Sequence, residues 1–251
     1  MNKFRRFGQF LLANSIKLTI LAILVTFTSA FGPELHGYFI RGYAGSKTVM
    51  VLGQRGGGSG FFIKAPSGKT FILTNAHVCG LQINGHMTVV TQNSRRYYKQ
   101  KVIKVYDKHD LCLIENIPGN TGLRVSSGLR VGETIGLIGH PKLQPLTLSK
   151  GEYIGGTVIK IAMNRFFKEP TKKQCPYTIE KYNTLFGPIW FCVRELFSSQ
   201  ITAYSRGGSS GSPVVNFFGN IVGVLFAGNP NDQFETFAVP LEDIKQFLKD
   251  Y

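Results

Sequence analysis

Three segments that lie far apart in the chain supply the groups of one reaction. They read Thr74-Asn75-Ala76-His77-Val78, His109-Asp110-Leu111 and Gly207-Gly208-Ser209-Ser210-Gly211-Ser212-Pro213. Each borders a short apolar run typical of a β-strand. Along the chain they provide an imidazole, a carboxylate and a hydroxyl, in that order. One such segment is a weak signal, whereas all three in this order strongly favour nucleophilic catalysis by a serine.

The chemistry explains why these residue types are needed together. A serine hydroxyl attacks a carbonyl only when a base takes its proton, and a carboxylate keeps that base in the right tautomer. We therefore assign Ser210 as the nucleophile, His77 as the general base and acid, and Asp110 as the orienting carboxylate. The main-chain N–H groups of Gly208 and Ser210 are predicted to form the oxyanion hole.

Other residues compete for two of these roles. Asp107 is the rival of Asp110, but it precedes the apolar run 111–114 and is expected on the connecting turn. His109 is next to Asp110, and an ordinary packing role is favoured for it over tuning of that carboxylate. The remaining histidines, which lack the surrounding motif, are His36, His86 and His140.

The three segments resemble the trypsin-like peptidase superfamily, and most closely its HtrA/Deg branch. Gly58-Ser59-Gly60-Phe61-Phe62-Ile63 resembles the strand that precedes the catalytic histidine there, and Phe237-Ala238-Val239-Pro240 resembles the segment before the closing helix. The resemblance runs from about Gly58 to Leu248. It implies an all-β, chymotrypsin-like fold of two packed six-stranded antiparallel β-barrels with a C-terminal helix. It also implies a serine endopeptidase that acts on proteins or peptides and needs no cofactor.

The chain departs from that family pattern in several places. Ser209 replaces the Asp or Asn that commonly precedes the nucleophile, and Ser212 replaces the second glycine after it. An insertion at about 163–199 has no counterpart that we can place. Since the chain ends soon after the expected closing helix, we expect no PDZ domain.

The strand-like runs and the resemblance together predict the domain organisation. A peptidase domain is expected over 38–248, with the first barrel at about 45–128 and the second at about 129–240. Strands are predicted, among other places, at 153–161 and 200–204. One helix should close the chain, with Pro240 at its first position.

The first 31 residues read as a targeting segment. Three basic residues, Lys3, Arg5 and Arg6, precede an apolar stretch over 10–31, and Thr28-Ser29-Ala30 resembles a cleavage site. Two interpretations stay open: a cleaved signal peptide and a retained membrane signal-anchor. In both, the catalytic part is exported to the periplasm or the cell exterior. A buried core helix is the third alternative.

Composition limits the partners. The 251 residues carry a net charge of +15. A generally basic surface is favoured over a nucleic-acid site, because the chain contains no basic motif of a known nucleic-acid module. We expect no nucleic-acid partner, and oligomer formation stays open.

The four cysteines form two sets. Cys79 and Cys112 follow His77 and Asp110 by two residues each, and buried free thiols are favoured there over a disulfide. For Cys175 and Cys192, which flank part of the insertion, a disulfide and free thiols are equally favoured. No Cys/His spacing indicates a zinc site.

The resemblance also implies where a substrate binds. The strand 224–228 would pair with an extended peptide, and Tyr204, Phe226, Ala227, Gly228 and Thr236 would surround the specificity pocket. No Asp occupies the base of that pocket, so cleavage after small or medium apolar residues is expected. The insertion is interpreted as a lid, a membrane-facing flap, an oligomer contact or a self-packed excursion.

Three other interpretations of the sequence are less favoured. The glycine run Gly56-Gly57-Gly58-Ser59-Gly60 is not followed by the Lys-Ser/Thr of a phosphate loop, so close packing of a strand against another backbone is favoured. The rival function is a catalytically inactive chymotrypsin-fold scaffold that binds at a membrane surface. An esterase with the same three groups is less favoured.

Overall fold

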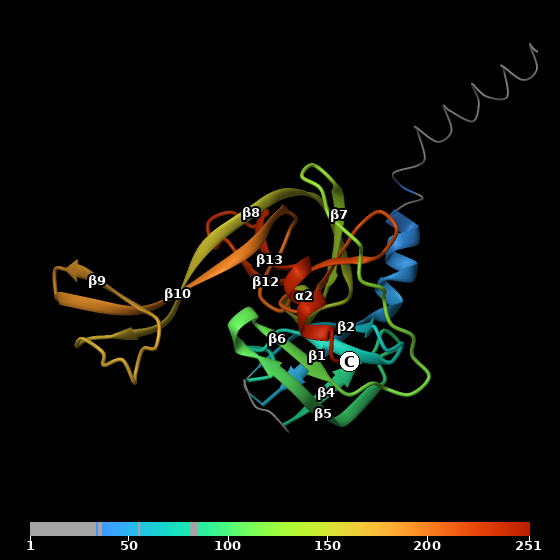
Figure 1. The fold of residues 1–251 in the computed structure, drawn as a ribbon, viewed down its shortest axis with the longest axis horizontal. Coiled ribbons are helices and arrows are strands. Elements are labelled where there is room, and N and C mark those ends of the chain that lie inside the picture. The colour runs from blue at the N-terminus through green and yellow to red at the C-terminus, as the bar shows by residue number, and fades with distance from the viewer. Residues whose placement is uncertain (1–33, 35–36, 55, 81–84) are drawn as a thin grey trace, which may run out of the picture.

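A computed structural model of the chain describes residues 34, 37–54, 56–80 and 85–251. The predicted targeting segment at 1–31 lies outside these residues. Within the described part, no helix is long and apolar enough to span a membrane. The described chain forms two β-barrels with a C-terminal helix beside them (Figure 1). The predicted all-β fold is therefore confirmed.

The first barrel closes because every strand finds a partner on both sides. Its strands follow the order β1-β2-β3-β6-β5-β4, and all of its pairings are antiparallel. They are β1 (Thr48–Gly53), β2 (Gly56–Lys64), β3 (Thr70–Thr74), β4 (His86–Val90), β5 (Arg96–Tyr106) and β6 (Leu111–Ile114).

Alternation along β2 buries both of its faces. Phe62 points into the first barrel, where it joins a cluster with Ile72. Its neighbours Phe61 and Ile63 point the other way, into a cluster that also holds Val224 of the second barrel. Successive side chains of a strand face opposite sides. One face of β2 therefore packs inside the first barrel, and the other face packs against the second barrel.

The second barrel also forms a closed ring of six strands, because β10 pairs with both β8 and β13. The ring runs β7-β8-β10-β13-β12-β11 and returns to β7. Its strands are β7 (Thr134–Gly139), β8 (Thr147–Phe166), β10 (Gly187–Thr202), β11 (Pro213–Val215), β12 (Ile221–Gly228) and β13 (Glu235–Pro240).

Two of these strands extend far beyond the barrel, which the sequence did not predict. From the Val158–Phe197 pair outward, β8 and β10 continue as a two-stranded arm, to which β9 (Thr178–Thr184) adds a third strand. We call residues 158–197 the ribbon; Figure 1 shows it projecting away from the barrels. The predicted strand 153–161 stops where the alternation of burial along β8 stops, and β9 has no buried residue that would mark it as a strand.

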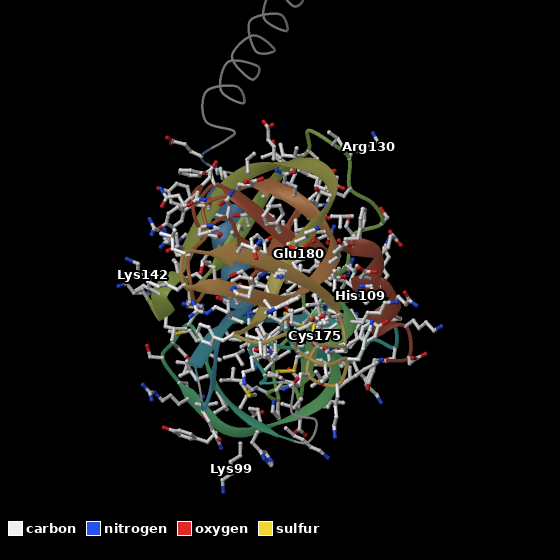
Figure 2. The ribbon with its side chains drawn as sticks, turned by 90° about the vertical axis from the view of Figure 1, so that its left-hand side faces the viewer. Lys99, His109, Arg130, Lys142, Cys175 and Glu180 are labelled. Carbon is white, nitrogen blue, oxygen red and sulfur yellow. A yellow bond between two sulfur atoms is a disulfide. The ribbon has the colours of Figure 1, made fainter. Side chains whose placement is uncertain are left out.

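A disulfide between Cys175 and Cys192 ties the loop before β9 to β10. Figure 2 looks onto the ribbon, with Cys175 and Glu180 in front of the barrels. Glu180 of β9 also accepts from Lys160 of β8 at 2.8 Å. The ribbon is thus held together by backbone pairing, one covalent bond and side-chain ties.

The closing helix α2 (Leu241–Leu248) begins one residue after Pro240, which the sequence placed at its first position. Its buried face consists of Leu241, Ile244, Phe247 and Leu248. Ile244 and Phe247 belong to the hydrophobic cluster that both barrels share. The helix therefore packs across the interface between the two barrels.

Candidate active site

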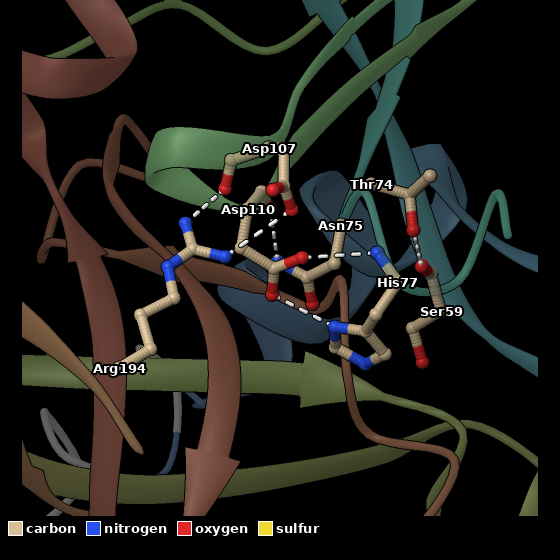
Figure 3. Close-up of polar contacts among 7 residues, drawn as sticks. All are labelled: Ser59, Thr74, Asn75, His77, Asp107, Asp110 and Arg194. Carbon is tan, nitrogen blue, oxygen red and sulfur yellow. Dashed lines mark hydrogen bonds and ion pairs between the residues drawn. The ribbon is translucent and has the colours of Figure 1, made fainter. Parts of the chain in front are cut away.

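The imidazole of His77 and the carboxylate of Asp110 form a directly bonded pair. His77 Nδ1 lies 2.7 Å from Asp110 Oδ2, and the main-chain N–H of His77 donates to Asp110 Oδ1 at 2.9 Å (Figure 3). The His77 side chain is 48% exposed, whereas that of Asp110 is 11% exposed. The carboxylate is therefore held on both oxygens, and it fixes the imidazole with Nε2 directed away from it.

Asp110 owes its position to the backbone of the turn before β6. It is left-handed, with φ 53° and ψ 45°, a conformation that Asp tolerates better than most residues. Its N–H donates to the Asp107 carbonyl at 2.9 Å, and its own carbonyl accepts from Asn75 Nδ2 at 3.0 Å. Asn75, two residues before His77, therefore helps to position Asp110.

A disulfide joins the turn that contains His77 to β6, the strand that follows Asp110. Cys79 and Cys112 are bonded, with their Cα atoms 6.5 Å apart, so the favoured interpretation of buried free thiols is wrong. Strand pairing explains the bond: Thr74 of β3 lies opposite Cys112, and the chain after Thr74 turns back over it. The bond fixes the turn of His77 against the strand that follows Asp110.

The Ser210 loop packs directly on β2. Gly211 has φ +84°, and a Cβ there would lie 2.0 Å from the Ser59 carbonyl. A Cβ on Gly58 would lie 2.6 Å from the Ser210 carbonyl and 2.8 Å from Val78. Only glycine fits at either place, which confirms that the glycine run serves close backbone packing. It also brings the Ser210 loop and the turn after His77 onto the same strand.

Ser59 connects this loop to its surroundings. Its N–H donates to the Ser210 carbonyl at 2.7 Å, and its Oγ donates to the Gly208 carbonyl at 3.0 Å. Its Oγ also accepts from the His140 N–H at 2.9 Å, and its carbonyl accepts from Thr74 Oγ1 at 2.6 Å (Figure 3). One buried serine thus ties together the Ser210 loop, β3 and the end of β7.

The N–H groups predicted to form the oxyanion hole are unengaged. Within the described residues, the amides of Gly208 and Ser210 donate to no protein acceptor, whereas those of Ser209, Gly211 and Ser212 all do. A buried or half-buried N–H without a partner is unusual in a folded protein. The loop therefore presents two donors to whatever enters beside Ser210.

Ser210 is half-buried, and among the described residues its Oγ makes no hydrogen bond with His77 or with another side chain. In enzymes without substrate this contact is often long and tightens only when substrate binds. His77 and Asp110 are thus bonded to each other, while the Ser210 hydroxyl has no side-chain partner among the described residues.

The two serines that depart from the family pattern are accommodated differently. Ser209 is buried, and its Oγ accepts from the Arg206 N–H at 3.4 Å. Ser212 is fully buried, and its Oγ finds no hydrogen-bond partner among the residues that the structure describes. A Cβ on Gly139 would come within 1.8 Å of that oxygen, so the hydroxyl fills a tight gap.

His140 is a buried histidine behind the Ser210 loop. Its Nδ1 bonds to the Gln144 carbonyl at 2.9 Å, and its Nε2 lies 3.1 Å from Gln92 Nε2. Burial lowers the pKa of His140 below its ordinary value, and the bond to Gln144 opposes this only in part. His140 is therefore a neutral structural imidazole rather than a rival to His77.

Two other competitors for catalytic roles are engaged elsewhere. His109 Nδ1 pairs with Asp243 of α2 at 2.7 Å and makes no contact with the Asp110 carboxylate. Asp107 lies on the connecting turn, as predicted, and is 48% exposed. Its carboxylate binds Arg194 and Tyr177 of the ribbon, at 3.2 and 3.1 Å respectively.

Two hollows flank the end of β12. One, of about 660 Å³, is bordered by Ser210, by residues 225–228 of β12 and by the loop 229–234. The other, of about 680 Å³, reaches from His77 and Asp110 to the base of the ribbon. Phe226, Ala227 and Gly228 border both hollows. This part of β12 therefore lies between the hollow that contains Ser210 and the hollow that contains His77.

Tyr204 and Thr236, the other two residues expected at the specificity pocket, do not border the hollow next to Ser210. Tyr204 borders neither hollow: its N–H donates to Ser149 Oγ at 2.8 Å, and its ring lies 6.0 Å from that of Phe234. Thr236 is fully buried, with its Oγ1 donating to the Ala203 carbonyl. The hollow next to Ser210 is lined instead largely by polar side chains, namely Ser205, Arg206, Asn229, Asn231, Asp232 and Gln233.

Comparisons with known proteins identify the family. The trypsin-like peptidase domain matches residues 58–224. Serine protease HTRA4 of Homo sapiens is 32% identical over 213 residues, which cover 82% of this chain and 36% of that protein. A serine protease HtrA-like of Staphylococcus aureus is 26% identical over 200 residues, covering 77% of this chain and 23% of that one. The chain thus spans only about a third or less of these relatives.

Solved structures agree at the level of the fold. The Rv3671c protease of M. tuberculosis in its active form matches with a TM-score of 0.61 at 19% identity, over 86% of each chain. The serine endoprotease from Yersinia pestis matches with a TM-score of 0.59 at 18% identity, over 84% of this chain and 64% of that one. Since the matched residues 58–224 also contain His77, Asp110 and Ser210, the chain belongs to the trypsin-like peptidase family, with HtrA-type serine proteases among its relatives.

Proposed function

We propose that the chain is an exported serine endopeptidase that cleaves peptide bonds of protein substrates through an acyl-enzyme on Ser210. The observation that carries the proposal is the His77–Asp110 pair, in which Asp110 binds both the imidazole Nδ1 and the main-chain N–H of the same histidine. This arrangement orients Nε2 as a proton acceptor. The two unengaged N–H groups beside Ser210 supply the second requirement, donors for an oxyanion.

The reaction follows from these groups. Ser210 Oγ attacks the carbonyl carbon of the peptide bond, and His77 Nε2 takes the hydroxyl proton. The carbonyl oxygen becomes an oxyanion and accepts from the N–H groups of Gly208 and Ser210. His77 then gives its proton to the leaving nitrogen, the C–N bond breaks, and an ester on Ser210 remains. Water, deprotonated by His77, hydrolyses this ester and restores the hydroxyl, while Asp110 stays ionised throughout.

An extended peptide finds a free strand edge at the site. The pairing of β12 with β11 reaches as far as Val224, and the main-chain groups of Leu225 bind Gly211 and Ser212. Beyond that point β12 pairs only with β13 within the described residues, so one edge of residues 226–228 is open. A substrate adding to this edge would run between the two hollows, with its carbonyl directed at Ser210.

The hollow beside Ser210 bears on specificity. We propose that it takes small or medium uncharged side chains. A Cβ at Gly228 would lie 2.6 Å from Ser205 Oγ, so there is little room at that wall. The acidic residue that borders the hollow, Asp232, is exposed and caps the Phe234 N–H at 2.9 Å. A peptide panel varied before the cleaved bond tests this; a strong Lys or Arg preference that disappears in Asp232→Asn would contradict it.

Export is the sequence-based part of the proposal. The basic residues before the apolar stretch 10–31 support translocation of everything that follows. N-terminal sequencing of the protein recovered from its native membrane or extracellular fraction distinguishes cleavage near Ala30 from a retained anchor. Recovery of the full-length chain only from the cytosol would contradict export.

Turnover of an unfolded protein tests the peptidase directly. The purified full chain should cleave a reduced, alkylated protein into peptides, and Ser210→Ala should abolish the cleavage without a change in circular dichroism. An inactive scaffold would bind the unfolded protein but release no peptides, and that outcome would overturn the proposal.

A further inference from the structure

Five aromatic side chains gather on the surface next to the start of the described chain. The helical turn at residues 37–43 exposes Tyr38 by 76%, Phe39 by 53% and Tyr43 by 36%. The rings of Phe39 and Tyr43 stack with centroids 5.7 Å apart. Singly exposed aromatic residues are unremarkable, but a cluster of this kind marks an interaction surface.

The turn between β11 and β12 extends the cluster. At its tip, Phe217 is 53% and Phe218 is 70% exposed, and their rings meet edge to face. A Cβ on the next residue, Gly219, would lie 2.8 Å from Tyr43, so this turn packs against the helical turn. Together, Tyr38, Phe39, Tyr43, Phe217 and Phe218 form one surface, which we call the aromatic surface.

Two hydrogen bonds to one side chain close the turn that carries Phe217 and Phe218. The Asn216 side-chain oxygen accepts from the N–H groups of Phe218 and Asn220, both at 3.0 Å. Gly219 supplies the left-handed residue that closes the turn, with φ +76°. At the tip of this turn, both phenylalanines still expose more than half of their surface to water.

Basic groups surround the aromatic surface. Lys47 Nζ lies 5.2 Å from the Tyr43 ring centroid, and Arg41 is exposed between Tyr38 and Tyr43. A Cβ on Gly37 would lie 3.0 Å from Lys150 Nζ. Glu34 is the acidic residue that shares this region with Tyr38 and Arg41. Among the described residues of this region, basic side chains therefore outnumber acidic ones.

Aromatic rings bordered by Lys and Arg are what a lipid–water interface accommodates. Tyr and other aromatic rings lie at headgroup level, and basic side chains approach the lipid phosphates. The sequence adds a constraint: the apolar stretch 10–31 ends seven residues before Tyr38, which spans at most about 25 Å of extended chain. Whatever membrane holds that stretch holds the aromatic surface close to it.

We propose that the aromatic surface docks on the anionic lipid–water interface of the membrane into which residues 10–31 insert, and so fixes the orientation of the peptidase domain. The inference rests on the membrane-inserted form of the proposed targeting segment and not on peptidase activity. A second copy of the chain fits less well, because a symmetric pairing would bring Arg41, Lys47 and Lys150 against their own copies. In Figure 1 the ribbon lies on the opposite side from the helical turn, so docking leaves the ribbon free.

Lipid-borne quenching of single probes tests the docking. The described cysteines are all in disulfides, so one added thiol is labelled without reduction. Full-length Phe218→Cys and Phe39→Cys, each carrying an environment-sensitive fluorophore, are reconstituted in phosphatidylcholine–phosphatidylglycerol vesicles with spin-labelled lipid. The matched control is Tyr98→Cys, an aromatic residue of β5 that is 64% exposed.

We expect quenching at positions 218 and 39 to exceed that at position 98 at least threefold, and to weaken in pure phosphatidylcholine. Equal quenching at all three positions overturns the proposal. Energy transfer between copies labelled at 218, without lipid quenching, overturns it in favour of a second copy. Circular dichroism confirms folding, and mass spectrometry confirms that residues 10–31 are retained. Because the readout is fluorescence, loss of peptidase activity leaves the result interpretable.

Discussion

Arg194 binds Asp107 and thereby connects the ribbon to the turn that carries Asp110. Its Nη1 donates to Asp107 Oδ1 at 3.2 Å, and its Nη2 donates to the Asp107 carbonyl. That same carbonyl accepts the Asp110 N–H at 2.9 Å. The Arg194 side chain is only 7% exposed, so this contact is better shielded from water than a surface ion pair.

Arg194 should therefore act as a positioning residue. We expect Arg194→Met to lower kcat about tenfold with a smaller change in KM, because displacement of a catalytic group costs rate more than binding. Steady-state kinetics on a peptide substrate measure this. Glu195→Gln, which changes the next residue of the same strand, is the matched control and should retain wild-type kcat. Equal kinetics for the two variants would show that the ribbon does not position Asp110.

The two buried serines near the active site should respond to removal of the hydroxyl in opposite directions. Ser212→Ala removes a buried Oγ that has no partner, so the free energy of unfolding should rise by about 1 kcal/mol. Ser59→Ala removes an Oγ that donates to the Gly208 carbonyl and accepts from the His140 N–H. This change should lower the free energy of unfolding by about 2 kcal/mol. Urea titrations of both variants measure the difference. Destabilisation by Ser212→Ala would contradict the structural account of that hydroxyl.

His140 makes stability depend on pH. Its pKa is lower in the folded than in the unfolded state because of burial, so its contribution is fully present above about pH 6.5, the ordinary histidine value. As the pH falls below that value, the unfolded state takes up a proton that the folded state does not, and the stability falls by up to about 1.4 kcal/mol per pH unit. The loss stops once the pH has passed the folded-state pKa.

Chemical denaturation from pH 8 to pH 5 measures this dependence. His140→Gln should flatten the curve below about pH 6.5, whereas His86→Gln, at an exposed position on β4, should leave it steep. An unchanged slope in His140→Gln would mean that another group accounts for the acid sensitivity.

The two disulfides should differ in what they stabilise. Replacing both Cys79 and Cys112 by Ala should lower the free energy of unfolding by roughly 3–4 kcal/mol and also reduce kcat, because the bond joins the turn of His77 to the strand that follows Asp110. Replacing Cys175 and Cys192 should loosen the ribbon, with a smaller effect on the unfolding of the barrels. Denaturation and hydrogen exchange distinguish the two. A larger effect of the ribbon disulfide on the barrels would contradict this division.

Much of the fold could be predicted because the local pattern of apolar, glycine and turn residues matches the strands and turns that form. The run at β2 alternates between two buried faces, and the position of Asp107 before an apolar strand correctly marked it as a turn residue. The glycines at 58 and 60 were interpreted as close-packing sites for the reason the structure shows. In each case a few neighbouring residues contain the physical cause.

The parts that were missed depend on partners far along the chain. Ser59 is a small residue between glycines, and its four partners lie in three other segments. Arg194 is one of many basic residues until the fold brings Asp107 to it. The Cys79–Cys112 bond requires the register of β3 against β6, which only the fold supplies.

Covalent labelling of Ser210 tests the central claim most directly. The folded full chain is treated with a fluorophosphonate, and the modified residue is located by mass spectrometry of its peptides. We predict a single adduct on Ser210, its absence in Ser210→Ala, and labelling slowed by several orders of magnitude in His77→Ala. An adduct on another residue, or a folded wild-type chain that is not labelled, would contradict the assignment of Ser210 as the nucleophile.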